Sequence, residues 1–259
     1  YQQTCGYEDK VRFAGSFQDY AENQKQGILS GFLTLEEGGV IEHRMERLDE
    51  LYEKGIRVIN MTWNHENCLG YPHNAPHSGH RGLKPFGFAV LERMDELGIV
   101  ADVSHLSDGG FWDCIRLSEK PVIASHSNCR ALCGHPRNLS DEMLRALGET
   151  GGVAGLNFYP HFVRENGKRV TRRTLCEHTL HMIRKGGEDL PAIGSDFDGY
   201  EIEEPKNEAY ISHVGEMELL WECMKQCGIT ERQLDKIWHG NAMRVLSETG
   251  GEINESSCL

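Results

Sequence analysis

The sequence has no run of apolar residues long enough to span a bilayer, and no signal-peptide pattern is visible. It also lacks an excess of positive charge, because 27 Lys and Arg stand against 40 Asp and Glu, for a net charge of -13. A chain of this charge is a poor partner for nucleic acid or for an anionic membrane surface. We therefore expect neither as a partner.

The pattern of the nine cysteines does not fit a secreted disulfide scaffold. Their number is odd, the chain is long, and no CxxC pair with zinc-ribbon spacing occurs. The cysteines are scattered through the expected strands, loops and helices. We expect reduced thiols and a cytoplasmic location.

Two short apolar runs, Ile99 to His105 and Pro121 to Ser127, each end in or near a histidine. An amphipathic helix pattern from Ser107 to Glu119 separates them, so the stretch is typical of two parallel strands joined by a crossover helix. His105 and His126 would then lie at the same edge of a sheet, where α/β folds build their active sites. The pair suggests a shared metal ion. The alternative is that each histidine merely hydrogen-bonds the end of its own strand.

The same pattern repeats along the chain and predicts an α/β fold. A length of 259 residues suits one barrel domain, residues 1 to 259. Strand, helix and turn signals alternate, and polar residues follow most of the strands, as in a TIM-type (β/α)8 barrel. Six of the eight strands are recognisable: Ile28 to Glu36, Arg57 to Trp63, Ile99 to His105, Pro121 to Ser127, Gly152 to Leu156, and Ala192 to Asp196.

Other candidate site residues also follow strands. Glu36 and Glu37 precede two glycines. This arrangement fits a metal or acid/base site, or an acidic loop exposed to solvent. Arg137, just ahead of a helix, could clamp a carboxylate or pair with a nearby Asp. Asp196 is well placed for proton transfer or for holding a substrate amine. The loop after Trp63 carries His65, together with His73, His77 and His80.

Six segments resemble the membrane dipeptidase (renal dipeptidase) family of zinc metallopeptidases, particularly its bacterial members. They occur in the family's order and spacing from about Ile28 to the C-terminus: LEEGG, ADVSHLSD, PVIASHSNCRALCGHPRNLSDE, GGVAGLNFYP, AIGSDFDG and HGNAMRVL. The resemblance implies a (β/α)8 barrel with two zinc ions at its C-terminal rim.

The resemblance also implies a role for each matching residue. Glu37, directly before the two glycines, matches the glutamate that bridges the two zinc ions. His105 and His126 match the histidines of the second zinc, which with Glu37 would form one open His2Glu site. Arg137 matches the arginine that grips the substrate's C-terminal carboxylate. Asp196 matches the acidic residue that assists proton transfer near the substrate's amino group.

Two departures from the family pattern affect the prediction. No strand here carries the His-x-Asp motif that supplies the remaining ligands of the first zinc, so we expect the first one or two β/α units of the barrel to be missing. The absence of a starting Met agrees with an N-terminally truncated chain. Trp63 stands where many members have the histidine that stabilises the tetrahedral intermediate, and His65 could replace it.

The sequence thus predicts a zinc-dependent dipeptidase in which a metal-bound hydroxide attacks the peptide bond of a short peptide. A catalytically impaired relative that serves as a binding or regulatory module is one alternative. Another amidohydrolase-type barrel is a weaker one, because no Lys occupies the bridging position. We expect a dipeptide as the small-molecule partner, and a homodimer is an open alternative to a monomer.

Overall fold

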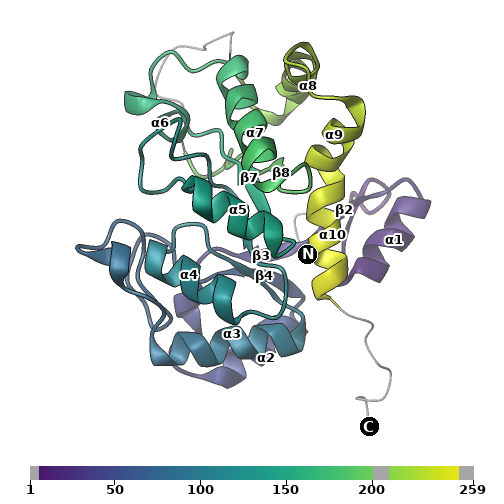
Figure 1. Ribbon diagram of the computed structural model, residues 1–259. Helices are drawn as coiled ribbons and strands as arrows, with labels where there is room; N and C mark the ends of the chain where they lie inside the picture. The colour runs from purple at the N-terminus through teal and green to yellow at the C-terminus, as the bar shows by residue number, and fades with distance from the viewer. Residues whose placement is uncertain (1–5, 201–209, 251–259) are drawn as a thin grey trace. The chain divides into compact units, whose positions relative to one another are not determined.

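The computed structural model describes residues 6–200 and 210–250. The chain divides into two compact units, one made of Tyr1–Pro121 with Met243–Leu259 and the other of Val122–Ala242. Both units combine parallel strands with helices (Figure 1).

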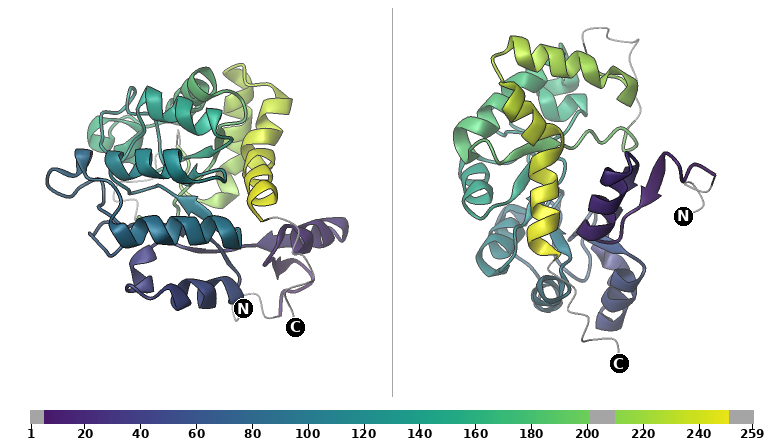
Figure 2. Two further views of the ribbon diagram at one scale, coloured as in Figure 1. Left: turned by 60° about the horizontal axis from the view of Figure 1, so that its bottom comes forward. Right: turned by 90° about the vertical axis from the view of Figure 1, so that its right-hand side faces the viewer.

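The first unit contains two sets of parallel strands. β1 (Val11–Phe13) pairs with β2 (Leu29–Gly31), and helix α1 (Phe17–Lys25) joins them. In both views of Figure 2 this purple segment forms one compact piece. The second set is β3 (Leu33–Leu35), β4 (Ile56–Asn60) and β5 (Val100–Asp102), paired in that order. Its strands are parallel, so their carboxyl ends share one edge.

The helices of the first unit follow its strands. Those between β3 and Pro121 are the 3-10 turn η1 (Gly38–Ile41), α2 (Met45–Glu53), the 3-10 turn η2 (Ser78–His80), α3 (Pro85–Leu97) and α4 (Asp108–Leu117). Pro85 opens α3, and Gly98, in a left-handed conformation (φ 76°), ends it. Apolar side chains of α2, α3 and the strands form a core that includes Leu48, Ile59, Leu91, Met94 and Ile99.

The second unit has three parallel strands, β6 (Ile123–Ala124), β7 (Val153–Leu156) and β8 (Pro191–Ile193). Two of its helices, α5 (Asp141–Glu149) and α7 (Arg172–Gly186), lie side by side (Figure 1). The side chain of Ser140 accepts a hydrogen bond from the backbone N–H of Met143, so Ser140 is the N-cap of α5. The other elements are α6 (Pro160–Val163), η3 (Glu165–Gly167), η4 (Val214–Glu216), α8 (Met217–Gln226), α9 (Glu231–Asp235) and the π-helical turn η5 (Lys236–Gly240).

The last helix is interrupted near Gly240. The interruption is the π-helical turn η5, and α10 (Asn241–Thr249) follows it. Asn241 is buried and donates hydrogen bonds to the carbonyl oxygens of Glu188 and Pro191. This asparagine therefore fastens the start of α10 to the segment that leads into β8.

Each of the six predicted strand regions contains a strand, but the first one was read wrongly as a single strand. Its residues form β2 and β3, which pair with different partners, β1 and β4. The stretch before Gln26 also contributes β1, which the sequence interpretation missed because a strand of three half-buried residues is too short to give a clear periodic pattern. Among the described residues, no helix is both long and apolar enough to cross a membrane.

Candidate metal centre

The edge formed by the carboxyl ends of β3, β4 and β5 carries a histidine and a carboxylate in close approach. His105 follows β5, and its Nε2 lies 3.4 Å from Oε1 of Glu36, which follows β3. The side chain of His105 is 9% exposed and that of Glu36 is 54% exposed. The other ring nitrogen of His105, Nδ1, lies 3.0 Å from Oδ1 of Asn64 in the loop after β4.

The separation of these two ligand atoms fits a shared ion. A charge-assisted hydrogen bond is shorter, about 2.7–2.9 Å. Two ligand atoms that each lie about 2.1 Å from a tetrahedral zinc are roughly 3.4 Å apart. Since an amide oxygen can only accept, the contact with Asn64 requires the proton of neutral His105 to sit on Nδ1. The lone pair of Nε2 then faces Glu36, and Asn64 stands where a metal-binding histidine would have its outer hydrogen-bond partner.

His105 has a left-handed backbone conformation, with φ of 68°. Its carbonyl oxygen accepts a hydrogen bond of 2.7 Å from the backbone N–H of His73, which holds the turn in place. Such conformations are uncommon outside glycine and concentrate at functional sites. The backbone after β5 is thus shaped to present this imidazole.

Glu37, predicted from the sequence as the bridging ligand, is hydrogen-bonded to its own turn and to the loop after β4. Its Oε1 accepts from the backbone N–H of Gly39 at 2.6 Å and from the side-chain amide of Asn67 at 2.5 Å. Its Oε2 accepts from the backbone N–H of Trp63 at 3.1 Å. Glu37 also caps η1. The carboxylate of Glu37 therefore shapes the loop, whereas that of Glu36 faces His105.

His65, the predicted substitute for the family's histidine, is exposed in the loop after β4. Its ring packs edge-on against Trp63 at 5.8 Å between ring centroids, and the Trp63 ring lies 6.4 Å from that of His105. Trp63 thus separates His65 from the candidate ligand. The catalytic role of His65 stays a prediction.

In the second unit, a buried asparagine links the ends of all three strands. Asn157, which follows β7, donates from its side-chain amide to the carbonyl oxygen of His126 at 3.3 Å and to Oδ2 of Asp196 at 3.0 Å. Nδ1 of His126 lies 2.6 Å from the hydroxyl oxygen of Ser125. The remaining ring nitrogen, Nε2, is the one suited to a metal.

Asp196 stands at a tight turn after β8. Its φ is 60°, and its carbonyl oxygen accepts a hydrogen bond of 3.0 Å from the backbone N–H of Gly199. Burial, together with the nearby Asp196 carboxylate, raises the pKa of Tyr200. The phenol therefore stays protonated at neutral pH.

Arg137, the predicted carboxylate clamp, is buried with 3% exposure between β6 and α5. Its Nη1 donates to the hydroxyl oxygen of Ser127 at 2.5 Å, and its guanidinium lies over the ring of Phe162 at 5.7 Å. These contacts fix the guanidinium beside the loop that follows His126. A guanidinium held this way could bind a carboxylate with little further loss of side-chain freedom.

The sequence interpretation missed the asparagines that organise both sets of residues. Asn64 follows Trp63 directly, and Asn157 interrupts the apolar run Gly152 to Tyr159. A polar residue within an apolar run at a strand end was the available signal for Asn157. Asn64 stood in a loop rich in polar residues, where nothing distinguished it.

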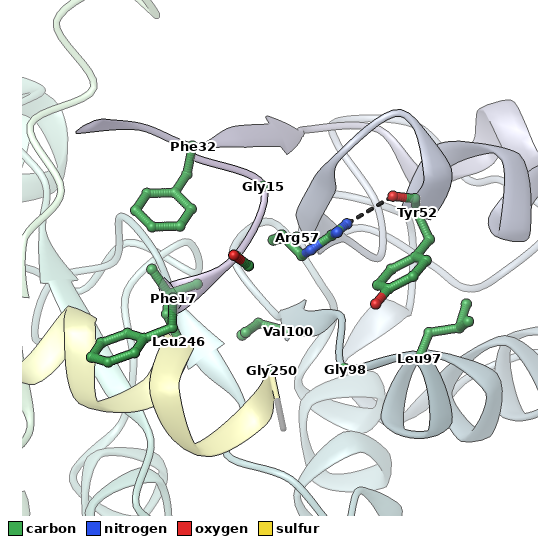
Figure 3. Close-up of a pocket in the computed structure, with 11 residues that line it drawn as sticks. Gly15, Phe17, Phe32, Tyr52, Arg57, Leu97, Gly98, Val100, Leu246 and Gly250 are labelled. Atoms are coloured by element: carbon green, nitrogen blue, oxygen red, sulfur yellow. Dashed lines mark hydrogen bonds between the residues drawn. The ribbon is translucent and has the colours of Figure 1, made fainter. Parts of the chain in front are cut away.

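One small cavity in the first unit, about 20 Å³ in volume, is lined by residues that include Gly15, Phe32, Leu97 and Arg57 (Figure 3). Arg57 donates to the carbonyl oxygen of Tyr52 at 2.8 Å. The space holds about one water molecule. None of its lining residues is a predicted site residue, so this cavity is no substrate site.

Comparison with known proteins identifies relatives along almost the whole chain. The family model described as membrane dipeptidase (Peptidase family M19) matches residues 1–257. An uncharacterized protein encoded in the pqqA 5' region of Klebsiella pneumoniae is 32% identical over 92% of this chain and 88% of its own length. An uncharacterized dipeptidase of Schizosaccharomyces pombe is 30% identical over 95% of this chain, which spans 59% of that protein.

A solved structure shares the fold. The metallopeptidase of Rhodobacter sphaeroides, crystallised with a phosphinate mimic of the dipeptide L-Ala-D-Ala, is 30% identical, with a TM-score of 0.83 over 92% of this chain and 69% of that one. This likeness confirms the predicted fold class, an α/β fold of the TIM-barrel type with parallel strands.

Proposed function

Because this chain belongs to the membrane dipeptidase family, Peptidase family M19, we propose that it is a zinc-dependent dipeptidase. The observation that carries the proposal is the approach of Glu36 Oε1 to His105 Nε2 at the carboxyl ends of two parallel strands. The donor set of imidazole and carboxylate is the one that hydrolytic zinc sites use.

We assign Glu36, His105 and His126 as zinc ligands, with Glu36 in place of the Glu37 expected from the sequence. The contact of His105 with Asn64 and the contact of His126 with Ser125 both use Nδ1, which leaves Nε2 as the ligand atom of each ring. Zinc bound there would make a water molecule reactive towards a peptide carbonyl at neutral pH.

The substrate side of the proposal uses Arg137 and Asp196. Buried Arg137 binds the C-terminal carboxylate of a dipeptide, because its guanidinium is already held by Ser127 and Phe162. Asp196, oriented by Asn157, holds the substrate's amino group and moves a proton to the leaving amine. A cation at one end and a carboxylate at the other would limit substrates to short peptides. His65 is retained as a substrate-binding residue.

No observation favours the two alternatives. The family match assigns the chain to dipeptidases rather than to other amidohydrolase-type barrels. Nothing in the described residues points to an inactive binding module. A cytoplasmic location and a homodimer stay predictions.

Hydrolysis of L-Ala-D-Ala and of L-Ala-L-Ala tests the proposal. Protein stripped with a chelator should be inactive and should regain activity when zinc is added. We expect His105→Ala to lower kcat/KM by more than about 1,000-fold, since bound metal supplies several kcal/mol of transition-state stabilisation.

His80→Ala is the matched control, because His80 is exposed in the same unit, and it should keep both metal and activity. A zinc-loaded protein that cleaves neither dipeptide would contradict the proposed function. Full zinc content in His105→Ala would contradict the ligand assignment.

A further inference from the structure

Three cysteines gather between two helices of the second unit. Cys176 lies on α7, Cys223 on α8, and Cys227 one turn further along at the C-cap of α8. Their Sγ atoms all lie within 4.8 Å of one another, and Cys176 Sγ lies 3.6 Å from Cys223 Sγ. Because residues four apart share one face of a helix, Cys223 and Cys227 both face α7.

The spacing of the sulfur atoms fits a common ion rather than a disulfide. A disulfide bond joins sulfur atoms about 2.05 Å apart. Three sulfurs that each lie about 2.3 Å from one metal ion are roughly 3.8–4.0 Å from one another. The three thiols thus need only small movements to share an ion.

The surroundings also suit a bound ion. Cys176 is fully buried, whereas Cys223 and Cys227 are half-buried. An ion could therefore enter from the side of α8 and be shielded by α7. Burial raises the pKa of Cys176 and of Cys223, so these two side chains are neutral thiols when no ion is bound. Each sulfur that binds an ion releases its proton to water.

Cys129 and Cys133 are also four residues apart, but their thiols have different hydrogen-bond partners from that of Cys176. Cys129 donates through its thiol to the carbonyl oxygen of His178 at 3.4 Å, and Cys133 to that of His161 at 3.3 Å. Their thiols serve separate backbone carbonyls. The thiol of Cys176, by comparison, faces another sulfur.

We propose that Cys176, Cys223 and Cys227 form a second metal site, in which three thiolates bind one thiophilic cation of the Cu(I) or Zn(II) class. Thiolate sulfur selects such soft ions. The site is separate in chemistry from the imidazole and carboxylate ligands proposed for catalysis. By joining α7 to α8, a bound ion would fasten α8 to the rest of the second unit.

Cd(II), a thiophilic ion with no redox chemistry in water, is a suitable probe. Reduced, chelator-stripped protein is titrated anaerobically while thiolate-to-metal charge-transfer absorption is followed in the ultraviolet. Imidazole and carboxylate ligands give no such band, so the signal reports the cysteines alone. We expect one thiolate-bound Cd(II) per chain, displaced by Cu(I) or by Zn(II), and the ion that displaces it at the lower concentration identifies the preferred occupant.

Cys223→Ser and Cys227→Ser should each weaken Cd(II) binding by more than about 100-fold. Loss of a residue that only hydrogen-bonds to a metal ligand would have a smaller effect. Both positions are half-buried and accept a hydroxyl. Cys114→Ala is the matched control, because Cys114 is a buried cysteine of α4 outside the cluster. It should leave the absorption band unchanged. Absence of the band in the parent protein, or its persistence in both serine variants, would overturn the site.

Discussion

At the scale of single residues, the neighbouring carboxylates Glu36 and Glu37 have different surroundings. Glu37 accepts hydrogen bonds from three N–H donors, which belong to Gly39, Trp63 and Asn67. Glu36 is more exposed and faces Nε2 of His105. Successive side chains of an extended segment point in opposite directions, so the two carboxylates cannot exchange these roles without rebuilding the turn.

Replacing each glutamate with glutamine separates the two roles. Glu36→Gln should lose most of its bound zinc and its dipeptidase activity, with little change in stability. Glu37→Gln should lower the free energy of unfolding by about 1–3 kcal/mol, because an amide cannot accept from all three donors. Zinc analysis and urea unfolding of the two variants check this. Loss of zinc in Glu37→Gln alone would restore Glu37 as the ligand.

The sequence predicted both histidines as ligands, and the family resemblance predicted Glu37 rather than Glu36 as the carboxylate. His105 and His126 each follow an apolar run, and this pattern is visible without a structure. The choice between Glu36 and Glu37 depends on which side chain the backbone N–H groups of Gly39 and Trp63 can reach. That is a property of the folded loop. The three-cysteine cluster also cannot be recognised from the sequence, because Cys176 and Cys223 are 47 residues apart.

At the scale of secondary-structure elements, Glu188 joins the segment before β8 to α9 and η5. Its two carboxylate oxygens accept from Arg232 at 2.5 and 2.6 Å, and Oε1 also accepts from Lys236 at 2.8 Å. The hydrogen bonds from Arg232 and then Lys236 lower the pKa of Glu188 from its ordinary value of 4.5 to about 2.

This pairing predicts a pH dependence of stability. Because the folded-state pKa lies below the ordinary value, the stabilisation by Glu188 is complete above about pH 4.5 and is lost as the pH falls towards 2. The difference in unfolding free energy between the parent and Glu188→Gln should therefore shrink across this range, as urea unfolding at several pH values would show. Glu149→Gln, at an exposed site on α5, should show no such trend. A constant difference for Glu188→Gln would contradict the assignment.

Gly155 in β7 lets the chain after β6 approach closely. A Cβ atom at this position would lie 1.7 Å from the carbonyl oxygen of Ser125, the residue before His126. The carbonyl oxygen of Gly155 also accepts a hydrogen bond of 2.8 Å from the backbone N–H of Ser127. Any side chain at Gly155 therefore displaces the loop that carries His126.

We expect Gly155→Ala to lower the free energy of unfolding by at least about 2 kcal/mol and to weaken zinc binding. Gly79→Ala is the control, because a Cβ at Gly79 would meet nothing within 4 Å, and its effect should stay within about 0.5 kcal/mol. Thermal unfolding and zinc titration measure both effects. Unchanged stability in Gly155→Ala would contradict the close approach.

The limits of prediction are different for strands and helices. The helix predicted from Ser107 to Glu119 contains α4, whose N-cap Ser107 stands next to an amphipathic run. The strand pattern predicted where strands occur but not how they pair. The division of Ile28 to Glu36 into β2 and β3 depends on partners that come from elsewhere in the chain.

At the scale of the whole molecule, bound metal should couple to folding. An ion that binds only the folded chain at 100 times its dissociation constant adds about 2.7 kcal/mol, which raises the Tm by about 5–10 °C in a protein of this size. Tm is measured with and without zinc in the Cys223→Ser variant, so that the proposed cysteine site does not contribute to the change. His105→Ala in that background should abolish the rise. A rise that survives His105→Ala would place the stabilising ion elsewhere.

The left-handed backbone at His105 restricts how this protein could be re-engineered. Only a few residue types, chiefly glycine, asparagine, aspartate and histidine, adopt that conformation readily. A designer who wished to alter the metal preference by ligand exchange could try an aspartate at this position. A cysteine at this position would adopt the left-handed conformation only with backbone strain. The turn therefore limits which metal ligands laboratory evolution can introduce here.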